Sequence, residues 1–293
     1  MKIVSCSEKK TRGIAKRLAQ TVAHTKSRKH ALVFGLTGEL GSGKTLFVKA
    51  FDTPEVTFRK RAFKEYKAHR PKAPDELVSQ IIEAHTLFKK LGITSIEQPG
   101  FEADDILGTL VEKFSSRDNL YITVLTGDLD TLQLVKNDTV TVLTPKKGVS
   151  QTVIYNEIGV KERFGVAPEH LTDYKGLVGD PSDNIPGVPG IGPKTAAGLL
   201  AEQPTLENLY RNLDKVKSKA TAKKLSDYKE QAFLSKHLAI IRRDVPFTIS
   251  LENLIYNKQY TKGLIDYFKK LGFTSLLRRL EYISESTTNC SSK

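Results

Sequence analysis

The sequence has no tryptophan, one methionine and two cysteines among its 293 residues. Cys6 and Cys290 lie near opposite ends without a CxxC or Cys/His spacing, which argues against a disulfide framework and a zinc site. No run of 18 apolar residues is present, so no membrane-spanning helix is expected. The start of the sequence, Met-Lys-Ile-Val at 1–4, is not followed by the apolar core of a signal peptide, so secretion is not indicated. We therefore expect a cytoplasmic protein of one or two domains with an ordinary buried core.

Positive charge is in excess but unevenly distributed. The 46 Lys and Arg residues exceed the 33 Asp and Glu residues by 13. Residues 1–50 carry 11 of the basic residues and only two acidic ones, Glu8 and Glu39, so the rest of the chain is almost balanced. A basic surface favours a polyanionic partner such as nucleic acid. The positions of the acidic residues decide what the larger part does.

The N-terminal segment predicts a phosphate-binding loop. Residues 8–25 have apolar positions at helical spacing among basic residues, which indicates a basic amphipathic helix. The apolar run 31–36 has the character of a buried strand and leads into Gly-Glu-Leu-Gly-Ser-Gly-Lys-Thr at 38–45. This matches the P-loop pattern, in which backbone N–H groups wrap a triphosphate; the alternative is a glycine-rich turn. The candidate ATP-binding residues are Gly38, Gly41, Gly43, Lys44 and Thr45.

Acidic residues after position 50 form four small clusters at the ends of apolar segments. A single cluster is explained by helix caps and turns. Four clusters gathered in one place would repel one another unless cations bound them. Oxygen ligands alone fit Mg²⁺ or Mn²⁺, and a pair of such ions serves two-metal phosphodiester cleavage. The acids in these clusters are Asp52, then Glu102, Asp104 and Asp105, then Asp128 and Asp130, and finally Asp180 and Asp183.

Two further stretches point to nucleic acid as the substrate. Residues 57–72 are dense in cations with Phe58, Phe63 and Tyr66 interleaved, a composition that binds phosphates and stacks on unpaired bases. The alternative is a solvated helix face. Residues 185–200 place a glycine hairpin before a helix, whose free N–H groups suit a DNA phosphate. This is the helix-hairpin-helix pattern, which binds duplex backbone without reading sequence.

Residues 51–280 closely resemble the 5′-nuclease domain of bacterial DNA polymerase I, in the flap endonuclease superfamily. The matching segments follow in order: Phe-Asp-Thr-Pro at 51–54, Thr-Phe-Arg at 57–59, Tyr-Lys-Ala-His-Arg-Pro at 66–71, Gly-Phe-Glu-Ala-Asp-Asp-Ile-Leu at 100–107, Leu-Thr-Gly-Asp-Leu-Asp at 125–130, the run from Gly-Leu-Val-Gly-Asp to Gly-Pro-Lys-Thr-Ala at 176–196, and Leu-Gly-Phe-Thr-Ser-Leu-Leu-Arg-Arg-Leu at 271–280. The resemblance implies a metal-dependent 5′–3′ exonuclease or flap endonuclease acting on DNA. With no polymerase domain after residue 293, it implies a stand-alone enzyme.

The resemblance also implies roles for individual residues. Arg59, Lys67 and Arg70 match cations that steer the scissile phosphate at the base of a helical arch, with Tyr66 beside them as a stacking residue. Gly190, Gly192, Lys194 and Thr195 match the element that grips duplex DNA with help from a K⁺ ion. The implied ligands of two Mg²⁺ or Mn²⁺ ions are Asp52, Glu102, Asp104, Asp105, Asp128, Asp130, Asp180 and Asp183.

The front of the chain departs from that family. Its members begin with a strand ending in Asp-Gly, whose Asp binds a catalytic metal, whereas residues 1–51 contain no aspartate. Residues 5–51 instead resemble the start of the P-loop ATPase TsaE, involved in tRNA threonylcarbamoyladenosine modification, which suggests a junction between two genes near residue 50. Residues 46–51 should be helix for the P-loop and strand for the nuclease. Strand 31–36 could substitute for the missing first strand, with Glu39 as a remote replacement for its carboxylate.

We therefore predict a 5′-nuclease-like α/β fold with a mostly parallel sheet flanked by helices and a C-terminal helix-hairpin-helix region. The expected parts are a truncated P-loop segment at 1–50, a nuclease core at 51–165, a DNA-binding helical region at 166–285 and a tail at 286–293. The expected function is two-metal hydrolysis of DNA near 5′ ends, flaps and duplex junctions. The alternatives are a DNA-binding module without catalysis, an ATPase, or a nonfunctional fusion that would unfold without cooperativity.

Overall fold

The computed structural model describes residues 32–37, 45–71, 74–137, 139–147, 151–256 and 261–278. The expected helix at 8–25, the loop residues Gly38, Gly41, Gly43 and Lys44, and the tail from 286 lie outside these ranges. The strands are β1 (Leu32–Thr37), β2 (Thr45–Phe51), β3 (Thr94–Glu97), β4 (Tyr121–Leu125), β5 (Val140–Lys147) and β6 (Gln151–Tyr155). The α-helices are α2 (Phe58–Ala62), α3 (Asp75–Lys90), α4 (Ala103–Phe114), α5 (Glu157–Phe164), α6 (Leu171–Val178), α7 (Pro193–Glu202), α8 (Leu206–Arg211), α9 (Lys219–Asp227), α10 (Lys229–Ala239) and α11 (Lys262–Lys270). Short 3-10 helices are η1 (Leu129–Leu134), η2 (Pro168–His170), η3 (Leu213–Lys215) and η4 (Glu252–Leu254).

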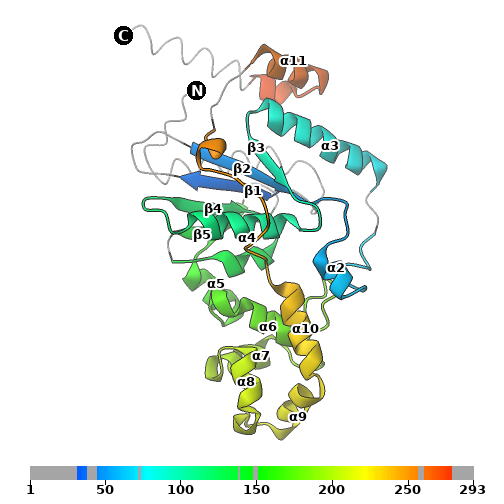
Figure 1. Ribbon diagram of the computed structural model, residues 1–293, viewed down its shortest axis with the longest axis vertical. Coiled ribbons are helices and arrows are strands. Elements are labelled where there is room, and N and C mark those ends of the chain that lie inside the picture. The colour runs from blue at the N-terminus through cyan, green and yellow to red at the C-terminus, as the bar shows by residue number, and fades with distance from the viewer. Residues whose placement is uncertain are drawn as a thin grey trace.

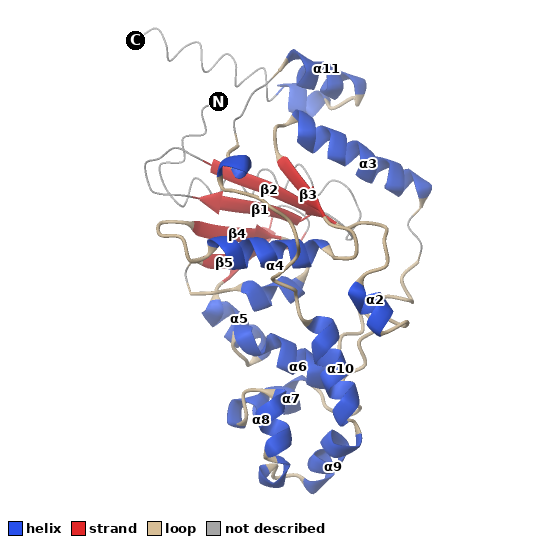
Figure 2. Ribbon diagram, viewed as in Figure 1, coloured by secondary structure: helices blue, strands red, loops and turns tan. Residues whose placement is uncertain are grey.

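In the described part of the chain the six strands form one mixed sheet, in the order β3-β2-β1-β4-β5-β6 (Figure 2). β2 and β3 pair in parallel, and so do β4 and β5. Central β1 runs antiparallel to β2 and β4, and edge strand β6 runs antiparallel to β5. The α/β class is confirmed. The expected mostly parallel sheet is instead mixed, because β1 and β6 run against the other four strands.

β2 settles the conflict at residues 46–51 in favour of the strand. Its side chains alternate between two buried clusters, with Val48 in one and Phe47 and Phe51 in the other, as a strand buried on both faces requires. A P-loop needs a helix directly after its lysine, since the helix N-terminus binds the phosphates. Thr45 instead opens β2. The nucleotide-binding role expected of Gly38, Gly41, Gly43, Lys44 and Thr45 therefore lacks the helix on which it depends.

β1 lies between β2 and β4, the position expected of a strand that replaces the missing first strand, but it runs antiparallel to both. Its last residue, Thr37, pairs with Thr45 and Tyr121, where β2 and β4 begin. The carboxyl end of β1 therefore lies at the opposite edge of the sheet from the carboxyl ends of β2 and β4. Glu39, the remote replacement considered for the missing carboxylate, lies outside the described residues.

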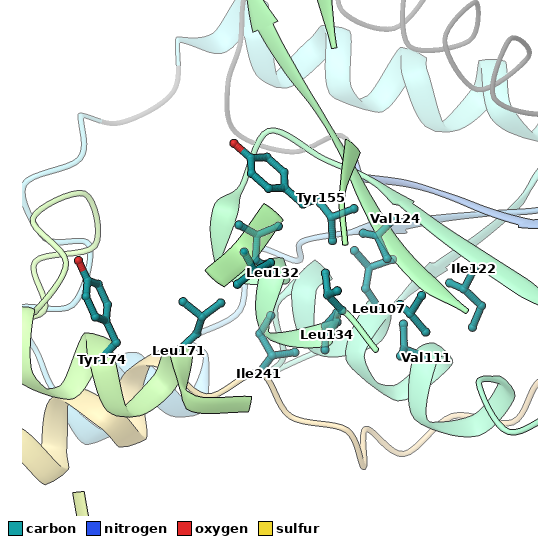
Figure 3. Packing of buried hydrophobic residues seen from close by; sticks show 14 of the residues in the cluster. Leu107, Val111, Ile122, Val124, Leu132, Leu134, Tyr155, Leu171, Tyr174 and Ile241 are labelled. Atoms are coloured by element: carbon teal, nitrogen blue, oxygen red, sulfur yellow. The ribbon is translucent and has the colours of Figure 1, made fainter. Parts of the chain in front are cut away.

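Apolar side chains bury both faces of the sheet. On one face, Leu107 and Val111 of α4 pack with Ile122 and Val124 of β4, and the same cluster extends to residues of η1 and α6 (Figure 3). On the other face, Phe88 of α3 belongs to a second cluster with residues of β2, β4 and β5. This arrangement fixes α4 so that its N-terminus lies where β2, β3 and β4 end. No described helix is both long and apolar enough to cross a membrane.

Helices α6 to α10 gather beyond the sheet, in the lower half of the view (Figure 1). The hairpin between α6 and α7 is held by α10, since Ser235 Oγ accepts a hydrogen bond from Gly187 N–H at 3.0 Å and Gln231 Nε2 donates one to Gly187 O at 2.6 Å. Gly187 has φ +62°, and a Cβ there would lie 2.3 Å from Gly179 N. Only glycine fits this close backbone approach. The predicted helix, glycine hairpin and helix are therefore present.

Candidate active site

The carboxyl ends of β2, β3 and β4 bring acidic residues from distant parts of the chain to one edge of the sheet. These strands run in the same direction, so the segments that follow them leave at the same edge. Asp52 follows β2, Asp128 follows β4, and the segment after β3 leads into the start of α4. Asp52 Oδ1 accepts a hydrogen bond from Ala103 N–H at 2.6 Å, which joins the end of β2 to the N-terminus of α4.

Asp104 lies close to the other carboxylates at this edge. Its pKa is raised well above 3.8 by burial, then by the negative charges of Asp128 and Asp52. Its Oδ1 atom is buried and has no hydrogen-bond partner among the described residues, and the same holds for Thr53 Oγ1. Buried oxygens of this kind are costly unless something binds them. Asp104, Asp52 and Asp128 therefore form a group of neighbouring carboxylates in which one buried Asp104 oxygen has no partner among the described residues.

Asp130 and Asp180 are compensated by a lysine that the sequence analysis did not select. Lys175 of α6 bonds through Nζ to Asp130 Oδ1, and its Nζ lies 2.6 Å from Asp180 Oδ2. Burial would lower the pKa of Lys175, but the two carboxylates outweigh it and raise that pKa. Burial raises the pKa of Asp130 to about 7 in spite of Lys175, with Asp128 and Asp180 adding to the effect.

The segment after α2 is attached to the remaining carboxylates, Glu102 and Asp183. Tyr66 is only 3% exposed, and its hydroxyl lies 3.2 Å from Glu102 Oε2 and 3.0 Å from Asp183 Oδ2. Lys67 Nζ lies 2.6 Å from Glu102 Oε2, and Arg70 pairs with Asp183 Oδ1. A buried tyrosine with its hydroxyl engaged cannot stack on a base. The expected stacking role of Tyr66 is therefore wrong, and the residue ties two carboxylates together.

Lys67 holds this attachment in a strained backbone conformation. Its φ is +53°, in the left-handed region that costs a non-glycine residue of order 1 kcal/mol or more. Its N–H donates to Asp183 O at 2.9 Å, and its Nζ also lies 3.5 Å from Asp183 Oδ2. Burial would lower the pKa of Lys67, but Glu102 and Asp183 raise it. The strain is offset by three contacts to the same two acidic residues.

Arg59 and Asp105 form a buried pair, which corrects two expectations. Both Asp105 oxygens accept hydrogen bonds from the Arg59 guanidinium, at 2.7 and 2.8 Å, and the two residues are 3% and 0% exposed. Arg59 also donates to Leu238 O and Ile240 O, and Asp105 accepts from Glu102 N–H in the capping box of α4. Both side chains are used in hydrogen bonds within the protein interior. They join α2, α4 and the end of α10.

The predicted duplex-binding residues lie together at the hairpin and the start of α7. Gly190 has φ +75°, and Gly192 is the N-cap of α7, with no side-chain cap. Lys194 and Thr195 are in the first turn, where backbone N–H groups have no partner within the helix. A Cβ on Gly190 would lie 2.5 Å from Lys224 Nζ, so a lysine of α9 lies against the hairpin. The hairpin belongs to the same connection as Asp180 and Asp183.

The donor set at the sheet edge suits a hard divalent cation, but it is not arranged as a complete metal site. Within the described residues, no three Asp, Glu, His or Cys side chains form a group that could hold a metal as they stand. Lysine and arginine groups already bind several of the carboxylates. The buried Asp104 oxygen without a partner fits a cation at the Asp52, Asp104 and Asp128 end.

Lys49 is another residue that the sequence analysis missed. It is fully buried on β2, with Nζ 4.8 Å from the centre of the Phe51 ring and 5.5 Å from that of Phe88. Burial lowers its pKa to about 7, although the charge of Asp52 acts against the shift. The signal available in the sequence was a lysine inside an apolar strand. The signal for Lys175 was a cation five residues before Asp180, directly before the matching segment 176–196.

The comparisons with known proteins place the chain in a nuclease family. Residues 19–165 match the family model "5'-3' exonuclease, N-terminal resolvase-like domain", and residues 166–262 match "5'-3' exonuclease, C-terminal SAM fold". The chain belongs to the 5′–3′ exonuclease family. The first match spans both the candidate P-loop and residue 50, and it gives no support to a TsaE-like fragment or to ATP binding.

Individual relatives agree with this assignment. DNA polymerase I of Bacillus caldotenax is 41% identical over 237 residues, which are 81% of this chain and 27% of that protein. DNA polymerase I of Bacillus subtilis (strain 168) is 42% identical over 236 residues, 80% of this chain and 27% of that protein. The chain thus spans 27% of the length of these relatives. T5 5′-exonuclease, solved with divalent metal ions (zinc) bound, has a similar fold, with a TM-score of 0.56 and 21% identity over 66% of this chain and 73% of that chain.

Proposed function

We propose that the protein is a divalent-metal-dependent 5′–3′ exonuclease or flap endonuclease that hydrolyses DNA phosphodiesters near 5′ ends. The observation that carries this proposal is the group of carboxylates Asp52, Asp104 and Asp128, in which a buried Asp104 oxygen has no partner among the described residues, beside the cations of residues 67–70. The matching polymerase relatives and the metal-bound T5 enzyme support the same chemistry. The part up to residue 165 would carry the chemistry, and the helical part from residue 166 would hold the duplex.

The proposed metal ligands are the carboxylates at the sheet edge, several of which are bonded to Lys67, Arg70, Lys175 or the Tyr66 hydroxyl. When bound, two Mg²⁺ or Mn²⁺ ions would supply an activated water and stabilise the leaving oxygen. Asp104 and Asp128 would hold the first ion, with Asp52 fixed against the N-terminus of α4 by its bond to Ala103. Asp105 stays with Arg59 and is left out of the set. The remaining ligands would be Glu102, Asp130, Asp180 and Asp183.

Lys67 and Arg70 would bind the scissile phosphate. Both side chains are about one-quarter exposed, at 25% and 28%, and both lie against the carboxylates. A phosphate placed between them would exchange one set of charge-assisted hydrogen bonds for another. The duplex would lie on the hairpin and the start of α7, where Gly192 leaves backbone N–H groups open to a phosphate and where a K⁺ ion could assist.

The test is cleavage of a 5′-labelled flap duplex in Mg²⁺ and in EDTA, with DNA binding measured in the same samples. We expect Mg²⁺-dependent cutting that Asp128→Asn abolishes while DNA binding is retained. Asp118→Asn is the matched control, because Asp118 is exposed and precedes β4 at the opposite end of the strand. Cutting in EDTA, or cutting by the Asp128→Asn variant, would contradict the proposal.

A DNA-binding protein without cleavage is the second candidate, favoured by the front of the chain. Residues 1–51 contain no aspartate, and β1 ends at the edge opposite to the carboxylates. In the family that the chain resembles, the first strand ends in an aspartate that binds a catalytic metal. Tight flap binding without cutting in either Mg²⁺ or Mn²⁺ would identify this second function in the assay above.

A further inference from the structure

The protein's own cations divide the carboxylates at the sheet edge into two groups. Asp104 has a buried oxygen without a partner among the described residues, and its raised pKa reflects burial and the neighbouring charges of Asp128 and Asp52. Asp180 is instead satisfied at both oxygens: Oδ2 lies 2.6 Å from Lys175 Nζ, and Oδ1 accepts hydrogen bonds from Ser182 N–H and Oγ at 2.8 and 2.7 Å. Asp104 thus has an oxygen available to a cation, whereas Asp180 already has a cation bonded to it.

Asp183 and Asp130 belong with Asp180. Asp183 Oδ1 pairs with Arg70, and its Oδ2 accepts from Tyr66. Asp130 Oδ1 is bonded to Lys175, which contacts carboxylates on both sides of the border between the sheet and the helical part. An ammonium and a metal ion cannot both be bonded along the same direction to these oxygens. A cation that uses the lone pairs of Asp130 Oδ1 and Asp180 Oδ2 now bonded to Lys175 must replace the lysine.

We propose that Lys175 is a built-in counter-cation that occupies the second metal position, so that a second divalent ion binds only by displacing it. This inference rests on the proposed function, since it concerns the same metal site. The first ion binds at the Asp104 and Asp128 end without competition. The second binds more weakly, because its entry breaks two ion pairs of a lysine whose side chain is only 13% exposed. Lys175 thereby acts as a positioning residue for Asp130 and Asp180 in the metal-free protein.

The first experiment is titration of the full chain with Mn²⁺ alone, with free Mn²⁺ followed by electron paramagnetic resonance. We expect two binding events in the wild type, the second at least tenfold weaker. In Lys175→Met the second event should tighten about tenfold, whereas Lys175→Arg should keep it weak. Lys161→Met, which removes an exposed lysine on α5, should change neither event by more than twofold. Two events with an unchanged or weakened second constant in Lys175→Met would overturn the inference.

A second measurement keeps the inference testable if Lys175→Met does not fold. Wild-type protein is acetylated briefly in EDTA and in saturating Mg²⁺, and the modification of each lysine is measured by mass spectrometry. Displacement predicts that Lys175 becomes at least fivefold more reactive in Mg²⁺ while Lys161 is unchanged. Equal protection of Lys175 in both conditions would mean that the lysine is a fixed structural tie. Absence of any Mn²⁺ binding by the wild type would overturn the proposed function as well, which separates the two failures.

Discussion

Tyr66 and Asp183 are 117 positions apart in the chain, yet the Tyr66 hydroxyl lies 3.0 Å from Asp183 Oδ2 in a buried hydrogen bond. The same hydroxyl lies 3.2 Å from Glu102 Oε2. Tyr66 thus connects the segment after α2, the start of α4 and the hairpin connection. Burial and the two carboxylates raise its pKa, so the hydroxyl keeps its proton and remains a donor.

Replacing Tyr66 by phenylalanine separates this role from base stacking. We expect Tyr66→Phe to lose about 1.5–3 kcal/mol of stability in urea denaturation, since hydrogen bonds to charged groups are removed from a buried site. Tyr228→Phe, at a tyrosine that is 40% exposed, is the control and should change stability by less than about 0.5 kcal/mol. A phenylalanine can still stack on a base. Wild-type stability in Tyr66→Phe would therefore contradict the positioning role.

The buried pair of Arg59 and Asp105 should be far more sensitive than an exposed pair of the same type. Asp105→Asn leaves the Arg59 guanidinium with two carbonyl acceptors and only the more distant charge of Glu102, 3.8 Å away, which should cost about 3–5 kcal/mol. The control is Asp244→Asn, because Asp244 and its partner Arg242 are 65% and 40% exposed in their side chains. An exposed pair contributes at most about 1 kcal/mol. Equal effects of the two substitutions on the urea midpoint would show that the buried pair does not stabilise the contact between α2, α4 and the end of α10.

The sequence predicted where the site lies better than it predicted which of its carboxylates pair with lysine or arginine side chains. Hydrophobic patterning places Asp52 and Asp128 after the ends of apolar segments, and they converge at one edge because β2 and β4 run in one direction. Which carboxylate faces a metal and which faces a cation depends on contacts between distant segments. Arg59 donates to Leu238 O, 179 positions away. Local patterns carry no signal for such a contact, and for the same reason the burial of Tyr66 was missed.

Asp104 should make stability depend on pH and on Mg²⁺. Its pKa is raised from 3.8 in the folded protein, and that of Asp130 is raised to about 7. Between about pH 4 and pH 7 the folded chain therefore binds more protons than the unfolded chain, so stability falls as pH rises through this window. Mg²⁺ should restore it, because it binds the ionised carboxylates. In EDTA, we expect the unfolding temperature to be several degrees higher at pH 5 than at pH 8.

Asp104→Asn tests the cause of this dependence. The substitution removes one of the repelling charges, so we expect a higher unfolding temperature than the wild type at pH 8 in EDTA. It also removes a proposed ligand. The rise in unfolding temperature produced by about 10 mM Mg²⁺ should therefore shrink to within about 1 °C of zero, compared with several degrees in the wild type. Asp118→Asn should behave as the wild type. A full Mg²⁺ response in Asp104→Asn would exclude Asp104 as a ligand.

Lys49 gives a pH dependence of the opposite sign. Burial lowers its pKa from 10.5 to about 7, and the Phe51 and Phe88 rings only partly stabilise the charged form. Between pH 7 and 10.5 the unfolded chain binds a proton that the folded chain does not, so this residue makes stability rise with pH. Below pH 7 the folded protein carries the buried charge, and the penalty is largest.

Lys49→Met should therefore stabilise the protein, and more at pH 6 than at pH 9. Methionine keeps the length of the side chain and is apolar, so it fills the same space against Phe51 and Phe88 without a charge to bury. We expect the unfolding temperature to rise by a few degrees at pH 6, at about 2–4 °C per kcal/mol for a chain of this size, and by less at pH 9. Lys113→Met, at an exposed position of α4, is the control. A loss of stability in Lys49→Met that is larger at pH 6 than at pH 9 would mean that the ammonium is held by an ion pair stronger than its burial penalty.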